Sequence, residues 1–199
     1  MVHGKQRQVS SANENFIEFV QALTDEVSKF DKTVLGLDAK NSVFRIYRDV
    51  RFSKDKSPYK TFFGATLMGK EKSCGIAGYY FHLEPGNSFL AGGVHMTEPQ
   101  NLKAIREEIS DKGKTFLKII NDKNFKDNFK IEGEKLAKFP QGFDKEDPMA
   151  EFLKYKELMI HHAVADSEVV SGSFLSDCIK VCKAMVPFNR FVNEPVMAL

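Results

Sequence analysis

The segment that most constrains the fold is the run GYYFHLEPGNSFLAGGVHM, which begins at Gly78. Two stretches rich in aromatic and aliphatic residues flank the sequence Pro-Gly-Asn-Ser, a pattern typical of a β-hairpin. Centring the turn on Gly86 and Asn87 pairs Leu83 with Leu90. Because side chains alternate along a strand, one face then carries Tyr79, Phe81, Leu83, Leu90, Gly92 and Val94, and the other carries Tyr80, His82, Glu84, Ala91, Gly93 and His95.

A second pair of strands is predicted just before this hairpin. Residues 43–52 alternate with period two, the connector SKDKSP contains turn-forming residues, and residues 59–68 form a run that returns antiparallel to the first. Only Arg48 interrupts the apolar face of the first strand. This predicts either a buried ion pair at Arg48 or a bulge near Asp49 that turns the side chain outward.

Helical spacing of apolar residues dominates both ends of the chain. Ser11 and Glu14 have the spacing of a capping box ahead of a helix predicted over residues 13–30. Ser173 is expected to cap a final helix, which Pro187 kinks or ends. Further helices are predicted after Thr97, over residues 115–121 and 122–129, and from Asp147.

Together these elements predict an α+β fold, in which a central, mainly antiparallel sheet of four or more strands is covered by the N- and C-terminal helices. The 199 residues fit a single domain spanning 1–199, and residues 1–12 are expected to form a flexible leader.

Features that would direct the chain to a membrane or to secretion are missing from the sequence. No secretory signal and no run of about 18 apolar residues is present, so a cytoplasmic protein without a membrane partner is expected. The three cysteines are too few and odd in number for a disulfide framework. Cys178 and Cys182 lie one helical turn apart and are expected to fill the core.

The strongest functional signal is the basic run FRIYRDVRFSKDKSPYK, residues 44–60. Its three Arg and three Lys exceed its two Asp by four charges, whereas the whole chain carries only +2. Arg45, Tyr47 and Arg51 share one strand face, and the outer two are about 13 Å apart by strand rise. Paired guanidinium donors and mobile ammonium groups suit a multivalent anion.

We therefore predict that this segment binds an anionic small molecule or a nucleotide, with Asp49 orienting an arginine. The predicted ligand-binding residues are Arg45, Arg48, Arg51, Lys54, Lys56, Tyr59 and Lys60. The alternative is structural, in which Arg48, Asp49 and Asp55 form an ion-pair network and the lysines are solvated on an edge strand. Extended nucleic acid is less well matched, because the net charge is close to zero.

Two other functions remain open. One is a metal-dependent hydrolase or nuclease that acts on a phosphate ester, for which Asp49, Asp55 and His82 are weak catalytic candidates. The other is a protein-interaction domain with a basic edge. No metal site is predicted, because His82 and His95 lie about 13 Å apart along the predicted hairpin and the adjacent pair His161 and His162 would point to opposite faces of a strand. No motif identifies a cofactor, and the oligomeric state is left open.

The basic run also carries a family resemblance. The pattern Arg-x-x-Arg-Asp-x-Arg-Phe followed by Lys-x-Pro-Tyr-Lys resembles the signature of a widespread, mainly bacterial family of domains of unknown function, which has no established activity. The residues that match are Arg45, Arg48, Asp49, Arg51, Phe52, Lys56, Pro58, Tyr59 and Lys60. The chain departs from the family in lacking Trp and starting with a polar leader, which indicates truncation or a divergent branch. It also carries Phe62 where members often have His, which argues against an acid-base or metal role at that position.

Overall fold

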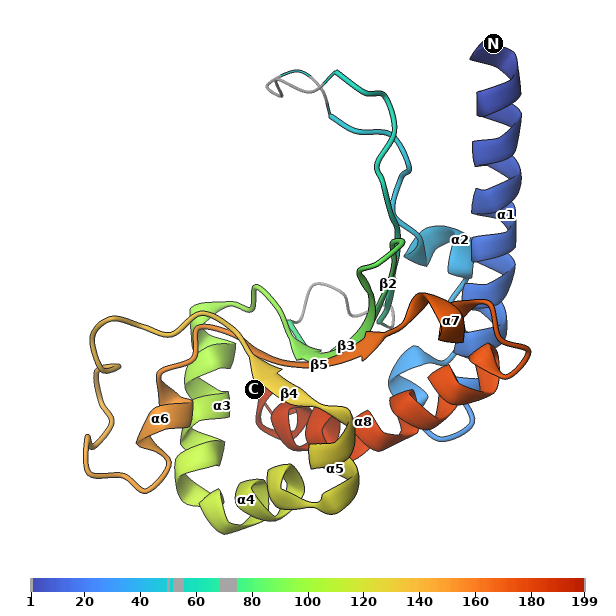
Figure 1. The fold of residues 1–199 in the computed structure, drawn as a ribbon. Coiled ribbons are helices and arrows are strands. Elements are labelled where there is room, and N and C mark those ends of the chain that lie inside the picture. Colours follow the sequence, from blue (N-terminus) through green and yellow to red (C-terminus); the bar gives the residue numbers. More distant parts are fainter. Residues whose placement is uncertain (1, 50, 52–55, 69–74, 199) are drawn as a thin grey trace.

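The computed structural model describes residues 2–49, 51, 56–68 and 75–198. Its centre is a five-stranded antiparallel sheet with the strand order β1-β2-β3-β5-β4. The strands are β1 (Phe63–Leu67), β2 (Gly78–Leu83), β3 (Ser88–Val94), β4 (Lys130–Glu132) and β5 (Leu158–Val164). Helices precede and follow the sheet, so the predicted α+β fold is confirmed (Figure 1).

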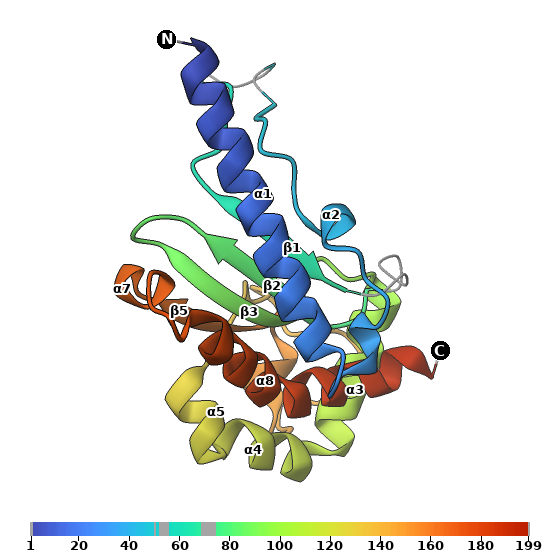
Figure 2. The ribbon, with the colours of Figure 1, turned by 90° about the vertical axis from the view of Figure 1, so that its right-hand side faces the viewer.

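Helices cover the convex face of this curved sheet and leave most of its concave face open (Figure 1). They are α1 (Val2–Val27), the 3-10 turn η1 (Lys32–Val34), α2 (Ala39–Ser42), α3 (Pro99–Asp111), α4 (Gly113–Asn121), α5 (Lys123–Asn128), α6 (Ala150–Leu153), α7 (Asp166–Val169) and α8 (Phe174–Met197). Helix α1 begins at Val2, so residues 2–12 are helical where a flexible leader was expected. Figure 2 shows α1 running diagonally past β1 and β2, with its N-terminal end beyond the sheet.

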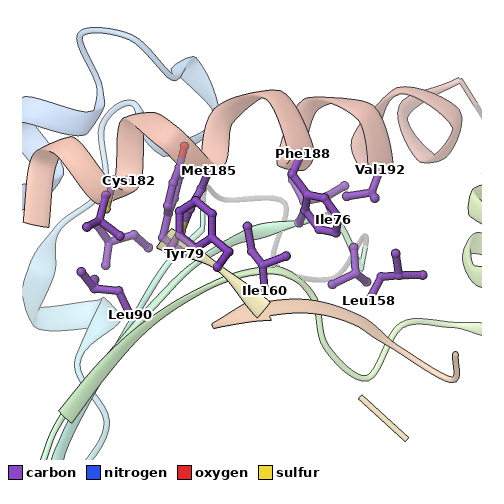
Figure 3. Packing of buried hydrophobic residues seen from close by; sticks show 14 of the residues in the cluster. Ile76, Tyr79, Leu90, Leu158, Ile160, Cys182, Met185, Phe188 and Val192 are labelled. Atoms are coloured by element: carbon purple, nitrogen blue, oxygen red, sulfur yellow. The ribbon is translucent and has the colours of Figure 1, made fainter. Parts of the chain in front are cut away.

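The core lies between α8 and the convex face of the sheet (Figure 3). Tyr79, Leu90 and Ile160 of the sheet pack against Cys182 and Met185 of α8, and all are fully or almost fully buried. Apolar residues on both sides of Pro187 bury against the sheet, so α8 continues past this residue instead of ending there, at the expense of one backbone hydrogen bond. Burial of both Cys178 and Cys182 confirms their predicted place in the core.

Two buried asparagines of α8 fix the helix to the backbone of the sheet. The Gly93 amide donates to Oδ1 of Asn189 at 2.8 Å, and Nδ2 of Asn189 donates to the Gly78 carbonyl at 3.1 Å. Asn193 bonds both the amide and the carbonyl of Ala77. Unpaired backbone groups are costly inside a protein, so these side chains set where α8 lies along β2 and β3.

The β2–β3 hairpin has the predicted faces in a different register. Phe81 pairs with Leu90, so the register is displaced by two residues from the predicted pairing of Leu83 with Leu90. The cause is a turn closed by side-chain hydrogen bonds: the Glu84 amide donates to the Ser88 hydroxyl, which donates to the Glu84 carbonyl. A displacement of two residues keeps every side chain on its face, because the strand period is two.

Two strand predictions need correction. The sequence ELMIHHAV follows a predicted helix, yet residues 158–164 form β5, a strand paired on both sides with β3 and β4. In contrast, the predicted strand over residues 43–52 has only isolated bridges in its described part, Val43 to Ala65 and Tyr47 to Tyr59. Between these two bridges the returning chain is two residues longer than the outgoing chain. The extra residues interrupt the ladder at residues 61–62.

Candidate functional site

The basic run forms an arm that projects from the sheet beside the N-terminal half of α1 (Figure 1). We define the arm as residues 44–49 and 56–62. Its two chains run antiparallel, and the Arg48 amide donates to the Pro58 carbonyl while the Lys60 amide donates to the Ile46 carbonyl. The rings of Tyr47 and Tyr59 lie 5.4 Å apart. The predicted strand-turn-strand therefore keeps its antiparallel course without forming a continuous ladder.

One predicted arginine is held by an acidic neighbour. Nε and Nη2 of Arg51 donate to the carboxylate of Asp49, the shortest contact being 2.6 Å, and the Arg51 amide donates to the same group. These hydrogen bonds lower the pKa of Asp49, first through the Arg51 side chain and then through its amide, and the charge of Arg45 adds to the effect. Both side chains are largely exposed, so the pair contributes little stability. The orienting role predicted for Asp49 thus has a partner in Arg51.

The other predicted ligand-binding residues differ in their surroundings. Arg48 is half-buried and Nη1 donates to the Ser57 hydroxyl at 3.3 Å. Arg45 is exposed, and no hydrogen bond or ion pair joins it to another residue in the described parts of the chain. Lys56 is exposed as well. Lys54 and Asp55 lie outside the described residues.

Lys60 occupies the base of the arm, where it is half-buried over aromatic rings. Its Nζ lies 5.7 Å from the centre of the Phe44 ring and 5.4 Å from the centre of the Phe62 ring. Among the described residues no carboxylate pairs with this ammonium group. A hollow of about 260 Å³ opens beside it, and its lining residues are Ala12, Ile46, Tyr59, Lys60, Thr61, Phe62 and Phe63. The structure thus brings Tyr59 and Lys60, two of the predicted site residues, to one hollow.

A ladder of four rings crosses the concave face of the sheet next to the arm. Ring centres are 4.5 Å apart between Phe62 and His82, 4.7 Å between His82 and Phe89, and 4.4 Å between Phe89 and His161. His82, which is only 7% exposed, is enclosed between Phe62 and Phe89. The position at which the family often carries His is therefore a ring-stacking position in this chain.

Three polar side chains form a hydrogen-bonded row on the same face: Tyr80 and His82 of β2, and Glu84, which directly follows this strand. The Tyr80 hydroxyl is 3.0 Å from Nδ1 of His82, and Nε2 of His82 is 3.3 Å from the carboxylate of Glu84. Hydrogen bonds from Asn87, Thr61 and His82, in that order, lower the pKa of Glu84 to about 2. Burial, followed by the charge of Glu84, raises the pKa of Tyr80. Strand alternation places Tyr80 and Glu84 beside His82, yet only His82 was singled out from the sequence.

The concave face also contains a groove with a volume of about 500 Å³. Tyr80, Phe89 and Phe44 supply rings to its lining, Ala91 supplies part of its floor, and His95 lies at its edge. Gly64 makes room for the Tyr80 hydroxyl, because a Cβ at this glycine would lie 2.8 Å from that oxygen. The face that the sequence predicted as polar with small residues is thus the floor of a groove.

The four histidines His82, His95, His161 and His162 make separate contacts in the described part of the chain. No group of three or more His, Cys, Asp or Glu side chains in the described residues is arranged to hold an ion. Nδ1 of His95 contacts Glu157, and Nδ1 of His162 contacts the Asn128 carbonyl. No helix formed by the described residues is both long and apolar enough to cross a membrane.

Comparison with known proteins gives one finding. Neither the curated proteins nor the solved structures contain a match to this chain. A family model described as "conserved hypothetical protein (DUF2461)" matches residues 3–191, which is nearly the whole chain. The chain therefore belongs to this family of conserved hypothetical proteins.

Proposed function

We propose that the protein binds an anionic ligand at the base of the arm, where Lys60 and Arg45 supply positive charge. The observation that carries this proposal is the environment of Lys60. Lys60 is a half-buried residue whose Nζ lies over two rings, it lines a hollow, and it pairs with no carboxylate among the described residues. A cation that lacks an acidic partner can bind an incoming anion through charge-assisted hydrogen bonds.

The surroundings of the other arginines reduce the number of residues expected to bind the anion. Arg51 forms an ion pair with Asp49 and follows the outgoing chain of the arm, so it presents less unbalanced charge than the sequence suggested. Arg45 makes no hydrogen bond or ion pair with another described residue, and its charge acts on the Asp49 carboxylate only from a distance. Lys60 and Arg45 are therefore the residues whose removal should affect binding most.

Isothermal titration calorimetry with inorganic phosphate, pyrophosphate and a nucleoside triphosphate at low salt tests the proposal. Each cation in contact with the ligand should contribute about 1.5–3 kcal/mol. The double variant Arg45→Ala and Lys60→Ala should therefore lose at least about 100-fold in affinity. The matched control removes two other charges that lie in surface ion pairs, by Lys103→Ala and Lys180→Ala, and should bind as the wild type does.

Salt provides a second readout. Binding should weaken as ionic strength rises, because exposed charges are screened. Absence of any binding at low salt by the folded protein, or equal loss of affinity in the control variant, would contradict the proposal. Turnover of a phosphate ester that requires added metal would instead support a hydrolase.

A further inference from the structure

The groove on the concave face is suited to a ring. Tyr80 lies between two aromatic neighbours, with its ring centre 5.9 Å from that of Phe44 and 5.7 Å from that of Phe89. Ala91 leaves space above the sheet, and none of the described lining residues is Asp, Glu, Lys or Arg. An apolar, partly aromatic lining favours the flat, uncharged part of a ligand.

The positive charge lies at the arm end of this groove. Phe44 lines the groove, and the ammonium group of Lys60 is 5.7 Å from the centre of the Phe44 ring. A ligand whose ring rests on the groove floor beside Phe44 therefore reaches Lys60 with a substituent of a few bonds' length. The sign of that substituent is set by Lys60, which attracts an anion.

The direction of the hydrogen bonds among Tyr80, His82 and Glu84 indicates which polar group the ring of the ligand should carry. Because the pKa of Glu84 is about 2, its carboxylate is ionised near neutral pH and only accepts hydrogen bonds. Nε2 of His82, which faces this carboxylate, is the donor in that contact, and in this tautomer Nδ1 accepts from the Tyr80 hydroxyl. The Tyr80 hydroxyl then donates its hydrogen to His82, and its oxygen can still accept a hydrogen bond from a ligand in the groove.

We propose that the ligand joins a planar ring bearing an N–H or O–H donor to an anionic group, with the ring in the groove, the donor on the Tyr80 oxygen and the anion at Lys60. This inference rests on the proposed anion-binding function and adds the chemical class of the ligand. Two sources supply this chemistry: nucleotides whose base carries a ring N–H, and hydroxylated aromatic carboxylates.

The test titrates the protein with guanosine monophosphate, 4-hydroxybenzoate, guanosine and inorganic phosphate by calorimetry. At least one of the two ring-bearing anions should bind about tenfold or more tightly than phosphate, and guanosine should bind more weakly than its phosphate. Which of the two binds tighter identifies the source. Tyr80→Phe keeps the ring and removes one hydrogen bond, so it should weaken the ring-bearing anion by about 3- to 10-fold while phosphate binding is unchanged.

A second variant fills the groove and leaves the three residues of the polar row unchanged in sequence. Thr66 is a half-buried groove residue directly opposite Tyr80 in the sheet, and Thr66→Phe should abolish the advantage of the ring-bearing anion over phosphate. Thermal unfolding followed by circular dichroism establishes that each variant is folded.

The possible failures are distinguishable. If phosphate and the ring-bearing anions bind equally, or if Thr66→Phe affects neither, the groove inference is overturned while anion binding at the arm stands. If ring-bearing anions bind with the same affinity after Lys60→Ala, the placement of the anionic group is overturned. If nothing binds, the proposed function fails together with this inference.

Discussion

Replacing Asn189 by leucine tests the way in which α8 is joined to the sheet. Asn189 is 2% exposed and is the hydrogen-bond partner of both the Gly93 amide and the Gly78 carbonyl. Leucine has a similar volume but leaves both backbone groups unpaired in the interior. Each unpaired group costs about 2 kcal/mol. The burial of a leucine in place of an amide returns about 1–2 kcal/mol, so Asn189→Leu should lower the free energy of unfolding by about 2–3 kcal/mol.

Urea unfolding followed by far-ultraviolet circular dichroism measures this change, since the chain contains no Trp to report by fluorescence. The midpoint should fall with the slope unchanged, and the melting temperature should fall by about 5–10 °C for a chain of this length. Asn15→Leu, at an exposed position of α1, is the matched control and should change stability by less than about 0.5 kcal/mol. A loss below about 1 kcal/mol in Asn189→Leu would show that the paired backbone groups do not depend on this side chain.

Three further predictions concern titration, thiol reactivity and backbone conformation. The pKa of Glu84 is depressed from its ordinary value of 4.5 to about 2, so its contribution to stability is complete above pH 4.5 and is lost as pH falls through 2; urea unfolding between pH 5 and pH 2 should show a smaller loss for Glu84→Gln than for the wild type. Burial raises the pKa of Cys178 to about 12 and that of Cys182 further; in a Cys74→Ala variant, a disulfide reagent should label neither thiol until urea unfolds the protein, and rapid labelling would contradict this. Gly93 has a φ of 97°, and a Cβ there would overlap a carbonyl oxygen of β5; Gly93→Ala should therefore cost at least about 2 kcal/mol in urea unfolding, and a neutral effect would contradict this geometry.

The faces of the central hairpin could be predicted because they depend only on strand alternation. Tyr79 and Phe81 face the core, and Tyr80 and His82 lie together on the opposite, concave face, as the period of two requires. The register could not be predicted, since it depends on hydrogen bonds that the Ser88 hydroxyl makes within the turn. Side-chain capping of a turn is decided by geometry that composition does not reveal.

Strand β5 shows the limit of local patterns. Its sequence LMIHHAV contains two adjacent histidines and follows a helix predicted from Asp147, and the local pattern left this segment without a firm assignment. What makes it a strand is pairing on both sides, with β3 and with β4. Tertiary pairing of this kind overrides local propensity.

The candidate site could likewise be predicted only in part from the sequence. Sequence spacing places Asp49 and Arg51 on one face of the predicted strand, and the structure joins them in an ion pair. The aromatic rings under Lys60 come from Phe44 and Phe62, which lie on opposite chains of the arm and meet only after folding. Charge counting therefore located the segment, whereas identifying which cations are without an acidic partner required three-dimensional contacts.

Chemical-shift mapping by nuclear magnetic resonance tests the central claim most directly. Titration of isotope-labelled protein with guanosine monophosphate at low salt should shift the amide signals of Lys60, Thr61 and Phe62 together with those of Tyr80 and Ala91, and should leave α4 and α5 unchanged. Shifts confined to the hollow between α4, α5 and α8, where Lys118 and Lys183 lie, or no shifts at all, would contradict an anion site at the base of the arm.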